Sequence, residues 1–268
     1  MSSDTILFKQ SGSVATITLN RPESRNALTP QMITDLGDAI HSCAAGEIRA
    51  VLLTGAGDAF CAGADLKGLV TRLESDGPQG LSEEIGQVAG TLHERVVLPL
   101  LRLKKPVVGA INGVAAGAGM SLALACDMRV GSASSRFKTV FIERSLSPDS
   151  GMSFFLPRIV GASRAFDLVY TSRFVDADEA YRIGLLDRLV PAESLLDEAK
   201  ELARQIAFWP PVAMQMSKRV MQRGMESDLE EQLKYETHGI VFGRRAPHDV
   251  EEAAASFREK RPPEFTGE

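Results

Sequence analysis

Cysteine, tryptophan and clustered positive charge are all scarce in this sequence of 268 residues. The three cysteines, Cys43, Cys61 and Cys126, are odd in number, include no Cys-x-x-Cys pair and lie among apolar residues. This pattern excludes a disulfide framework and is typical of a reducing cytosol, so we expect a cytoplasmic location. The four histidines have no metal-ligand spacing, and we therefore expect no metal site.

Two further absences concern possible partners. Lysine and arginine form no run, and 30 basic against 35 acidic residues give a net charge of −5. Nucleic acid is therefore an unfavourable partner, because neutralising its phosphates needs clustered positive charge. No apolar stretch approaches the roughly 18 residues needed to cross a bilayer. The opening segment contains Asp4 and no long apolar run, unlike a secretory signal. We expect neither a membrane nor a nucleic-acid partner.

The first part of the chain alternates strand-like and helix-like segments. Residues 14–19 are β-branched and alternating, and they end at the turn signal Asn20-Arg21-Pro22. Thr29 and Pro30 predict the start of a helix whose apolar residues recur at spacings of three and four. Residues 49–54 and 107–112 are short apolar runs, typical of strands buried on both faces of a parallel sheet. With a helical region between them from about residue 82 to 103, they predict an α/β fold.

Helical patterns dominate after about residue 160. Asp176–Glu179 is a capping box, Gly184 is a helix stop, and an apolar helical face follows Ser194. Helices are predicted at about 212–223, 228–241 and 250–260, with no strand pattern between them. We therefore divide the chain into a core at residues 1–195 and a helical region at residues 196–268. Residues 261–264 are expected to form a loose tail.

The first segment with residues suited to binding or catalysis is 58–67, in which Ala62, Gly63 and Ala64 are followed by Asp65. Small residues let the backbone approach a partner closely, and Asp65 is a candidate cap for a helix starting at Leu66. Amide groups at such a helix start suit the stabilisation of an oxyanion. The alternative is a tight strand-to-helix turn with no ligand.

A second turn of small residues spans 112–120, after the strand predicted at 107–112. It lacks the Lys-Ser/Thr of a P-loop, and its glycines at 113, 117 and 119 do not match G-x-G-x-x-G, so a dinucleotide site is not expected. What remains is again a backbone amide at the start of a helix. Two such turns could supply two donors to one oxygen, which is what acyl chemistry requires.

The third segment places Asp149 in the turn Pro-Asp-Ser-Gly, between apolar stretches. An apolar pocket would make this carboxylate a candidate base, whereas an Asx turn would give it a purely structural role. Glu143 is the nearest other carboxylate, and its neighbour Arg144 favours an exposed or ion-paired role for it.

Taken together, these segments resemble the crotonase superfamily, the enoyl-CoA hydratase/isomerase family. The resemblance spans nearly the whole chain. It rests on Leu19–Leu28, Phe60–Leu66, Gly113–Asp127, Ala177–Val190 and Phe257–Arg261. It implies an α/β fold with a spiral core of ββα units, a helical C-terminal trimerisation region, and a homotrimer or dimer of trimers. It also implies acyl-CoA thioester substrates and no cofactor besides the coenzyme A of the substrate.

The resemblance also assigns roles to individual residues. The amides of Ala64 and Ala118 would bind the thioester oxygen as it becomes an enolate. The position of Ala118 is usually glycine in the family, and alanine keeps the amide but narrows the space beside it. The CoA portion would be bound near Arg25, Ala62, Ala64, Asp65 and Leu66, with Lys260 reaching its phosphates.

The departures from the family pattern bear on the reaction. Hydratases carry two glutamates at positions that are Ser121 and Phe141 here, and neither side chain is a carboxylate that activates water. Asp149 lies where isomerases of the family keep their acid, and residues 113–127 and 148–149 resemble the ring-opening isomerase of phenylacetate degradation. We therefore expect an enoyl-CoA isomerase with Asp149 as its base. The alternatives are a hydratase or hydrolase with another base, or a catalytically silent acyl-CoA-binding paralogue.

Overall fold

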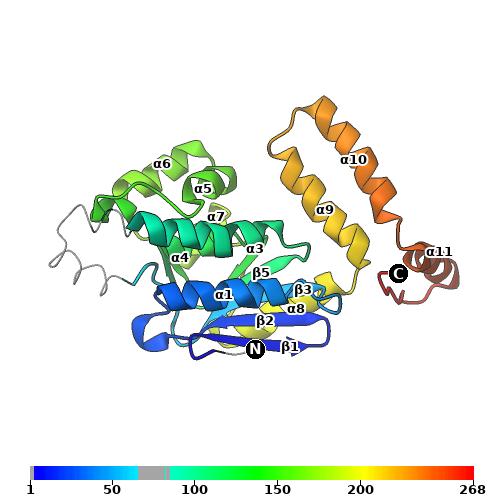
Figure 1. Ribbon diagram of the computed structural model, residues 1–268, viewed down its shortest axis with the longest axis horizontal. Coiled ribbons are helices and arrows are strands. Elements are labelled where there is room, and N and C mark those ends of the chain that lie inside the picture. The colour runs from blue at the N-terminus through cyan, green and yellow to red at the C-terminus, as the bar shows by residue number, and fades with distance from the viewer. Residues whose placement is uncertain (1–2, 66–81, 83–84) are drawn as a thin grey trace.

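A computed structural model describes residues 3–65, 82 and 85–268 of the chain. Its larger sheet has six strands in the order β1-β2-β3-β5-β7-β9. Figure 1 labels β1, β2, β3 and β5 of this sheet. β1 pairs antiparallel with β2, and all later pairs are parallel. The strands are β1 (Ile6–Ser11), β2 (Val14–Leu19), β3 (Ala50–Gly55), β5 (Val107–Ile111), β7 (Met128–Gly131) and β9 (Arg188–Leu189). The three predicted strands, β2, β3 and β5, are confirmed, whereas β7 and the edge strands β1 and β9 were missed. β1 is largely exposed and β9 has two residues, so neither has a clear buried pattern.

A smaller parallel sheet has the order β4-β6-β8, with β4 (Ala59–Cys61), β6 (Val114–Ala116) and β8 (Arg136–Lys138). Each of its strands directly follows a strand of the larger sheet, as β4 follows β3 and β6 follows β5. The chain therefore repeats a pair of strands before returning through helical segments. This arrangement confirms the spiral of ββα units that the resemblance implied.

Helices cover both faces of the larger sheet. In β3, Val51 and Leu53 join the main core with α1 (Pro30–Ser42), while Ala50 and Leu52 pack against α8 (Leu195–Ala207). The Thr29 hydroxyl accepts a hydrogen bond from the Met32 amide and caps α1, as predicted. The main core also includes residues of α4 (Ala118–Leu124), α5 (Met152–Val160), α6 (Ala162–Thr171), α7 (Ala177–Arg182), α3 (Leu98–Arg102) and the π-helical turn η2 (His93–Val97). Short 3₁₀ turns are η1 (Pro22–Ser24), η3 (Phe141–Arg144) and η4 (Ala192–Ser194).

The position of α8 bears on the division of the chain. Leu195, Ala199 and Leu202 are buried against β-strand residues, so this helix is a layer of the core. The predicted boundary at residues 195/196 would separate α8 from the sheet that it covers. We propose that the core extends to the end of α8 and that the helical region begins near Trp209.

The last three helices lie beside the core (Figure 1). α9 (Pro211–Gly224) and α10 (Leu229–Gly243) form a pair, and α11 (Pro247–Glu259) follows with the chain end. Leu229, Leu233 and Val241 are exposed on this region, whereas Ile206 belongs to α8 and packs against the sheet. No helix among the described residues is long and apolar enough to cross a membrane.

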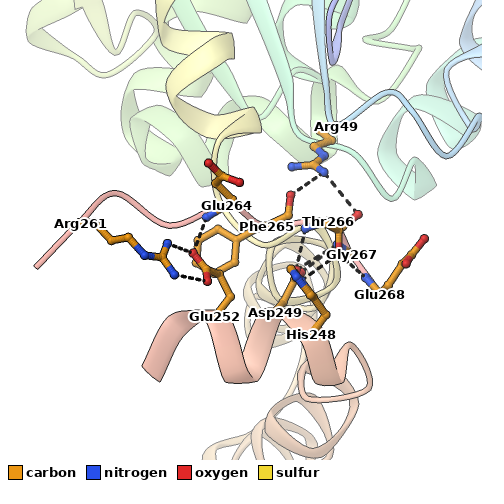
Figure 2. A network of polar contacts seen from close by, with 10 residues as sticks. All are labelled: Arg49, His248, Asp249, Glu252, Arg261, Glu264, Phe265, Thr266, Gly267 and Glu268. Carbon is orange, nitrogen blue, oxygen red and sulfur yellow. Dashed lines mark hydrogen bonds and ion pairs between the residues drawn. The ribbon is translucent and has the colours of Figure 1, made fainter. Parts of the chain in front are cut away.

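The C-terminal segment is anchored, which contradicts the expectation of a loose tail (Figure 2). The buried Asp249 carboxylate accepts hydrogen bonds from the amides of Thr266 and Gly267, at 2.7 and 3.0 Å. The Arg49 guanidinium, which precedes β3, donates to the Phe265 carbonyl at 2.8 Å. The tail thus connects α11 to the core. The sequence of the tail, with two prolines and mostly polar residues, does not indicate this anchoring. The residues that bind the tail lie far away in sequence or on the preceding helix.

Two glycines allow the smaller sheet to pack closely against α4. A Cβ atom on Gly119 would lie 2.1 Å from the Cys61 carbonyl oxygen, and one on Gly63 would lie 2.8 Å from the Ala116 carbonyl oxygen. Both distances are shorter than any real contact of a Cβ with an oxygen. Glycine at these positions is therefore required by the approach of the two backbones.

We expect Gly119→Ala to lower the free energy of unfolding by about 1–3 kcal/mol, because an overpacked core must shift its backbone. Chemical denaturation would measure this loss. Gly46→Ala is the matched control, since a Cβ on Gly46 meets nothing within 4 Å. Equal stability of the two variants would contradict the close packing of α4 on β4.

A second prediction concerns Glu252. Its carboxylate accepts a hydrogen bond from the Arg261 guanidinium at 2.8 Å and so anchors the tail to α11. Hydrogen bonds from Arg261, and then from the Glu264 amide, lower the pKa of Glu252 from 4.5 to about 2. A carboxyl whose pKa is lowered by folding stabilises the fold above its unfolded pKa, and this stabilisation is lost as the pH falls.

We therefore expect wild type to have a higher unfolding temperature than Glu252→Gln at pH 6. The difference should shrink as the pH falls from 4.5 toward 2. Thermal unfolding followed by circular dichroism over this range would measure it. Glu251→Gln, at an exposed position of the same helix, should show no such difference at any pH. A difference in unfolding temperature between wild type and Glu252→Gln that does not change with pH would contradict the lowered pKa of Glu252.

Candidate active site

Two turns meet at the carboxyl edge of the smaller sheet. β4 and β6 are parallel neighbours with Cys61 opposite Ala115, so the chain leaves both strands at the same edge. Ala64 follows β4, and Ala118 begins α4 after β6. A Cβ on Gly63 would lie 3.5 Å from the Ala118 nitrogen, so the two turns are in contact. The structure thus brings together the two amides that the sequence predicted as a pair.

Both amides are available to an external acceptor. On either side of Ala64, the Leu28 amide donates to the Gly63 carbonyl at 2.7 Å and the Asp65 amide donates to the Leu28 carbonyl at 3.0 Å. The Ala64 amide takes no part in this backbone pairing. Within the part of the chain that the structure describes, neither Ala64 N–H nor Ala118 N–H donates a hydrogen bond. Two adjacent unpaired donors form the arrangement that stabilises an oxyanion.

Asp149 lines the same pocket as these two turns. It is half-buried, and its carboxylate accepts a hydrogen bond from the Ser150 hydroxyl at 2.7 Å. Its backbone carbonyl accepts bonds from the Ser121 hydroxyl at 3.1 Å and from the Met152 amide at 2.9 Å. The three residues predicted to be catalytic, from three separate segments, therefore lie around one pocket.

The rest of the described pocket wall is mainly apolar. Phe141 and Ala62 both line it, and so does Asp65, whose carboxylate is paired with Arg21 at 3.0 Å. Leu66, the predicted start of a helix capped by Asp65, lies outside the described residues. The other lining residues are Leu28, Pro30, Gly63, Ile85, Val88, Ala89, Leu92, Gly117, Val140, Arg144, Leu146 and Ser150. An apolar wall with few polar groups suits an acyl chain.

The resemblance places Ser121 and Phe141 at the positions of the two hydratase glutamates. Ser121 is fully buried, and its hydroxyl donates to the Asp149 carbonyl, so it supports the turn that carries the acid. Phe141 is nearly buried and forms part of the pocket wall. Among the described residues that line the pocket, only Asp149 and the ion-paired Asp65 carry carboxyl groups.

The two basic residues expected to contact coenzyme A lie differently. Arg25 is exposed with a left-handed backbone (φ 53°), and its carbonyl accepts a hydrogen bond from the Ala62 amide at 2.9 Å, which places it at the pocket rim. Lys260 caps the end of α11 and is not among the described residues that line this pocket. The structure therefore does not bring Lys260 to the site of its own chain.

Two nearby groups do not suit a catalytic role. Glu143 forms an ion pair with Lys138 at 2.7 Å, and the hydrogen bond from Lys138 lowers the pKa of its carboxyl. This confirms the ion-paired role predicted for Glu143. Burial raises the pKa of the Cys61 thiol to about 12, so Cys61 is not a thiolate nucleophile at neutral pH.

Sequence reasoning missed His93. Its Nε2 atom accepts a hydrogen bond from the Ser150 amide at 3.2 Å, directly beside Asp149. No spacing in the sequence connects the two residues, which are 57 positions apart along the chain. Only the packing of the π-helical turn against the Asp149 turn brings them together.

Comparison with known proteins supports the same fold and identifies a family. The profile of the family described as enoyl-CoA hydratase/isomerase matches residues 9–268. The probable enoyl-CoA hydratase EchA12 of Mycobacterium tuberculosis is 39% identical over 259 residues, covering 94% of this chain and 89% of the relative. The 1,2-epoxyphenylacetyl-CoA isomerase of Escherichia coli is 36% identical over 256 residues, covering 95% of both.

A solved structure gives the same result. The enoyl-CoA hydratase from Bacillus anthracis superposes with a TM-score of 0.91 at 31% identity, covering 98% of this chain and 100% of that one. The two free amides at the edge of the smaller sheet and the match over residues 9–268 lead to one conclusion. The chain belongs to the enoyl-CoA hydratase/isomerase family, whose members act on acyl-CoA thioesters.

Proposed function

We propose that this enzyme is an enoyl-CoA isomerase that moves a carbon–carbon double bond from position 3 to position 2 of an acyl-CoA thioester. The observation that carries the proposal is the pocket itself, in which, among the described residues, two unpaired amides line the same space as Asp149, an acid with no ion pair, while the other lining acid, Asp65, is paired with Arg21. The isomerase relative in Escherichia coli supports it, although other relatives are named hydratases.

The proposed mechanism uses these groups in two steps. The amides of Ala64 and Ala118 donate to the thioester oxygen, and they stabilise the negative charge that develops when a proton leaves carbon 2. Asp149 accepts that proton as the double bond of the substrate becomes conjugated with the enolate. It then returns the proton to carbon 4, which completes the shift. The reaction is redox-neutral, and the only coenzyme it needs is the coenzyme A of its substrate.

A single acid is sufficient for this shuttle, whereas hydration needs a group that handles water. Ser121 and Phe141 occupy the positions of the two hydratase glutamates, and Ser121 is already engaged with the Asp149 carbonyl. The second candidate, a hydratase, is favoured only by the names of relatives such as EchA12. It would have to use Asp149 both to activate water and to protonate the acyl chain.

We further propose that the CoA portion extends along the rim formed by Arg25, Ala62 and Asp65. Ala64, Leu66 and Lys260 complete the proposed set of CoA contacts. Because Lys260 is not among the described residues that line the pocket of its own chain, we propose that it reaches the site of a neighbouring subunit. A long cationic side chain suits the phosphates of a solvent-exposed nucleotide.

A direct assay separates the candidate functions. Purified protein would be supplied with a 3-enoyl-CoA or a 2-enoyl-CoA, with binding measured beside turnover. Conversion of the 3-enoyl to the 2-enoyl ester supports the isomerase. Formation of a 3-hydroxyacyl ester from the 2-enoyl ester supports the hydratase. Tight binding of both esters without turnover would indicate a silent paralogue.

The sharpest prediction concerns the acid. Asp149→Asn should lower kcat by about 10²–10⁴-fold, the usual contribution of a general acid/base, while acyl-CoA affinity changes little. Steady-state isomerisation of a 3-enoyl-CoA, with calorimetric binding of the product ester, would measure both quantities.

Two substitutions serve as controls for the acid. Glu143→Gln removes the other nearby carboxylate and should lose far less activity, as should Ser121→Ala. An Asp149 that only forms the turn would tolerate asparagine, because asparagine makes the same hydrogen bonds within an Asx turn. A near-normal rate for Asp149→Asn would therefore contradict the mechanism.

We propose that the protein assembles as a homotrimer or dimer of trimers through its helical region. Large apolar side chains are exposed on α10 and α11, and water contact with them is unfavourable unless another chain covers them. They include Leu229, Leu233, Ile240, Val241 and Phe257.

We expect sedimentation velocity at micromolar concentration to give a trimer or hexamer. Lys260→Ala should keep this assembly but bind CoA esters more weakly at low salt, and the deficit should shrink as salt screens the phosphate contact. A stable monomer would contradict the trimer. Unchanged low-salt binding by an assembled Lys260→Ala variant would contradict only the role of Lys260.

A further inference from the structure

The turn that carries Asp149 has an unusual backbone. Ser150 and Gly151 both adopt positive φ angles, of 52° and 84°. The left-handed region is unfavourable for a serine, which has a Cβ atom, so the surrounding structure must hold this conformation. Ser150 is also buried, and its amide therefore needs a partner inside the protein.

His93 provides that partner. Its Nε2 atom accepts the Ser150 N–H at 3.2 Å, and its ring is half-buried. Because a backbone amide only donates, Nε2 must be unprotonated, and in a neutral ring the proton then lies on Nδ1. His93 opens the π-helical turn His93–Val97, and such turns are frequent at functional sites.

Ser150 connects this contact to the acid. Its hydroxyl donates to the Asp149 carboxylate at 2.7 Å, while its amide is held by His93. The same residue therefore joins the imidazole to the carboxylate. On the other side, the Ser121 hydroxyl fixes the Asp149 carbonyl at 3.1 Å.

We propose that His93 is a positioning residue for the Asp149 carboxylate, acting through Ser150. The inference rests on the proposed function, because it concerns the placement of the acid that moves the proton. His93 is not among the described residues lining the pocket, so it acts on the acid and not on the substrate. Without it, the Ser150 amide is unpaired and the left-handed turn is free to relax, which moves the carboxylate away from the reacting carbons.

The first test compares two substitutions of His93. His93→Leu removes the acceptor at similar bulk and should lower kcat by about 10–100-fold, as misplacing a catalytic group by about 1 Å does. KM should change little, since the amides and the pocket wall are unaltered. His93→Gln should recover most of kcat, because its amide oxygen can take the place of Nε2. Glu94→Gln, at the next and exposed position, is the control and should behave as wild type.

The second test asks whether the effect passes through Asp149. In an Asp149→Asn background, His93→Leu should cause little further loss of kcat, since coupled residues are not additive. A full additional loss would overturn the proposal, as would a wild-type kcat for His93→Leu. Failure of glutamine to recover activity, in a variant that remains folded, would also overturn it.

A measurement independent of turnover keeps the two proposals apart. Nitrogen-15 NMR of the His93 ring in the wild-type protein should show the neutral tautomer with the proton on Nδ1. The Ser150 amide resonance should shift in His93→Leu and less in His93→Gln. A proton on Nε2 would overturn the role of His93 even if the enzyme is an isomerase. Absence of isomerisation by wild type, with the expected tautomer, would overturn the proposed function while the contact itself stands.

Discussion

The close approach of the turn after β4 to the start of α4 is the constraint on which the site depends. Parallel pairing sends both chains out of the same sheet edge, and glycines at 63 and 119 let their backbones touch. A side chain at either position would separate the turns and with them the amides of Ala64 and Ala118. The two hydrogen-bond donors there are backbone amides. They therefore do not depend on the side chains at these two positions, but they do depend on the distance between the two backbones.

The acid is held by a different set of contacts. Asp149 stands in a turn between η3 and α5. Its carbonyl accepts a hydrogen bond from the Ser121 hydroxyl of α4, and the amide of the next residue, Ser150, donates to His93 of the π-helical turn. The Ser121 hydroxyl thus supports the turn that carries Asp149. One element, α4, therefore provides the unpaired Ala118 amide at its first residue and this support three residues later.

The helices after the core differ from α8 in how they pack. α8 covers the second face of the larger sheet, where it packs against β2, β3, β5 and β7. α9, α10 and α11 leave apolar side chains exposed, and the chain end returns to the core through Arg49 and Asp249. The tail thereby fixes α11, the helix that carries Lys260, relative to the sheet.

Local patterns in the sequence determined much of this protein. The caps at Thr29 and Asp176, the doubly buried strands and the small-residue turns depend on neighbours within a few positions, so they could be predicted together with Ala64, Ala118 and Asp149 as candidates. The tertiary structure alone decided that these three share a pocket, that α8 belongs to the core and that the tail is anchored. It also revealed His93, because a hydrogen bond between residues 57 positions apart leaves no periodic signal in either segment.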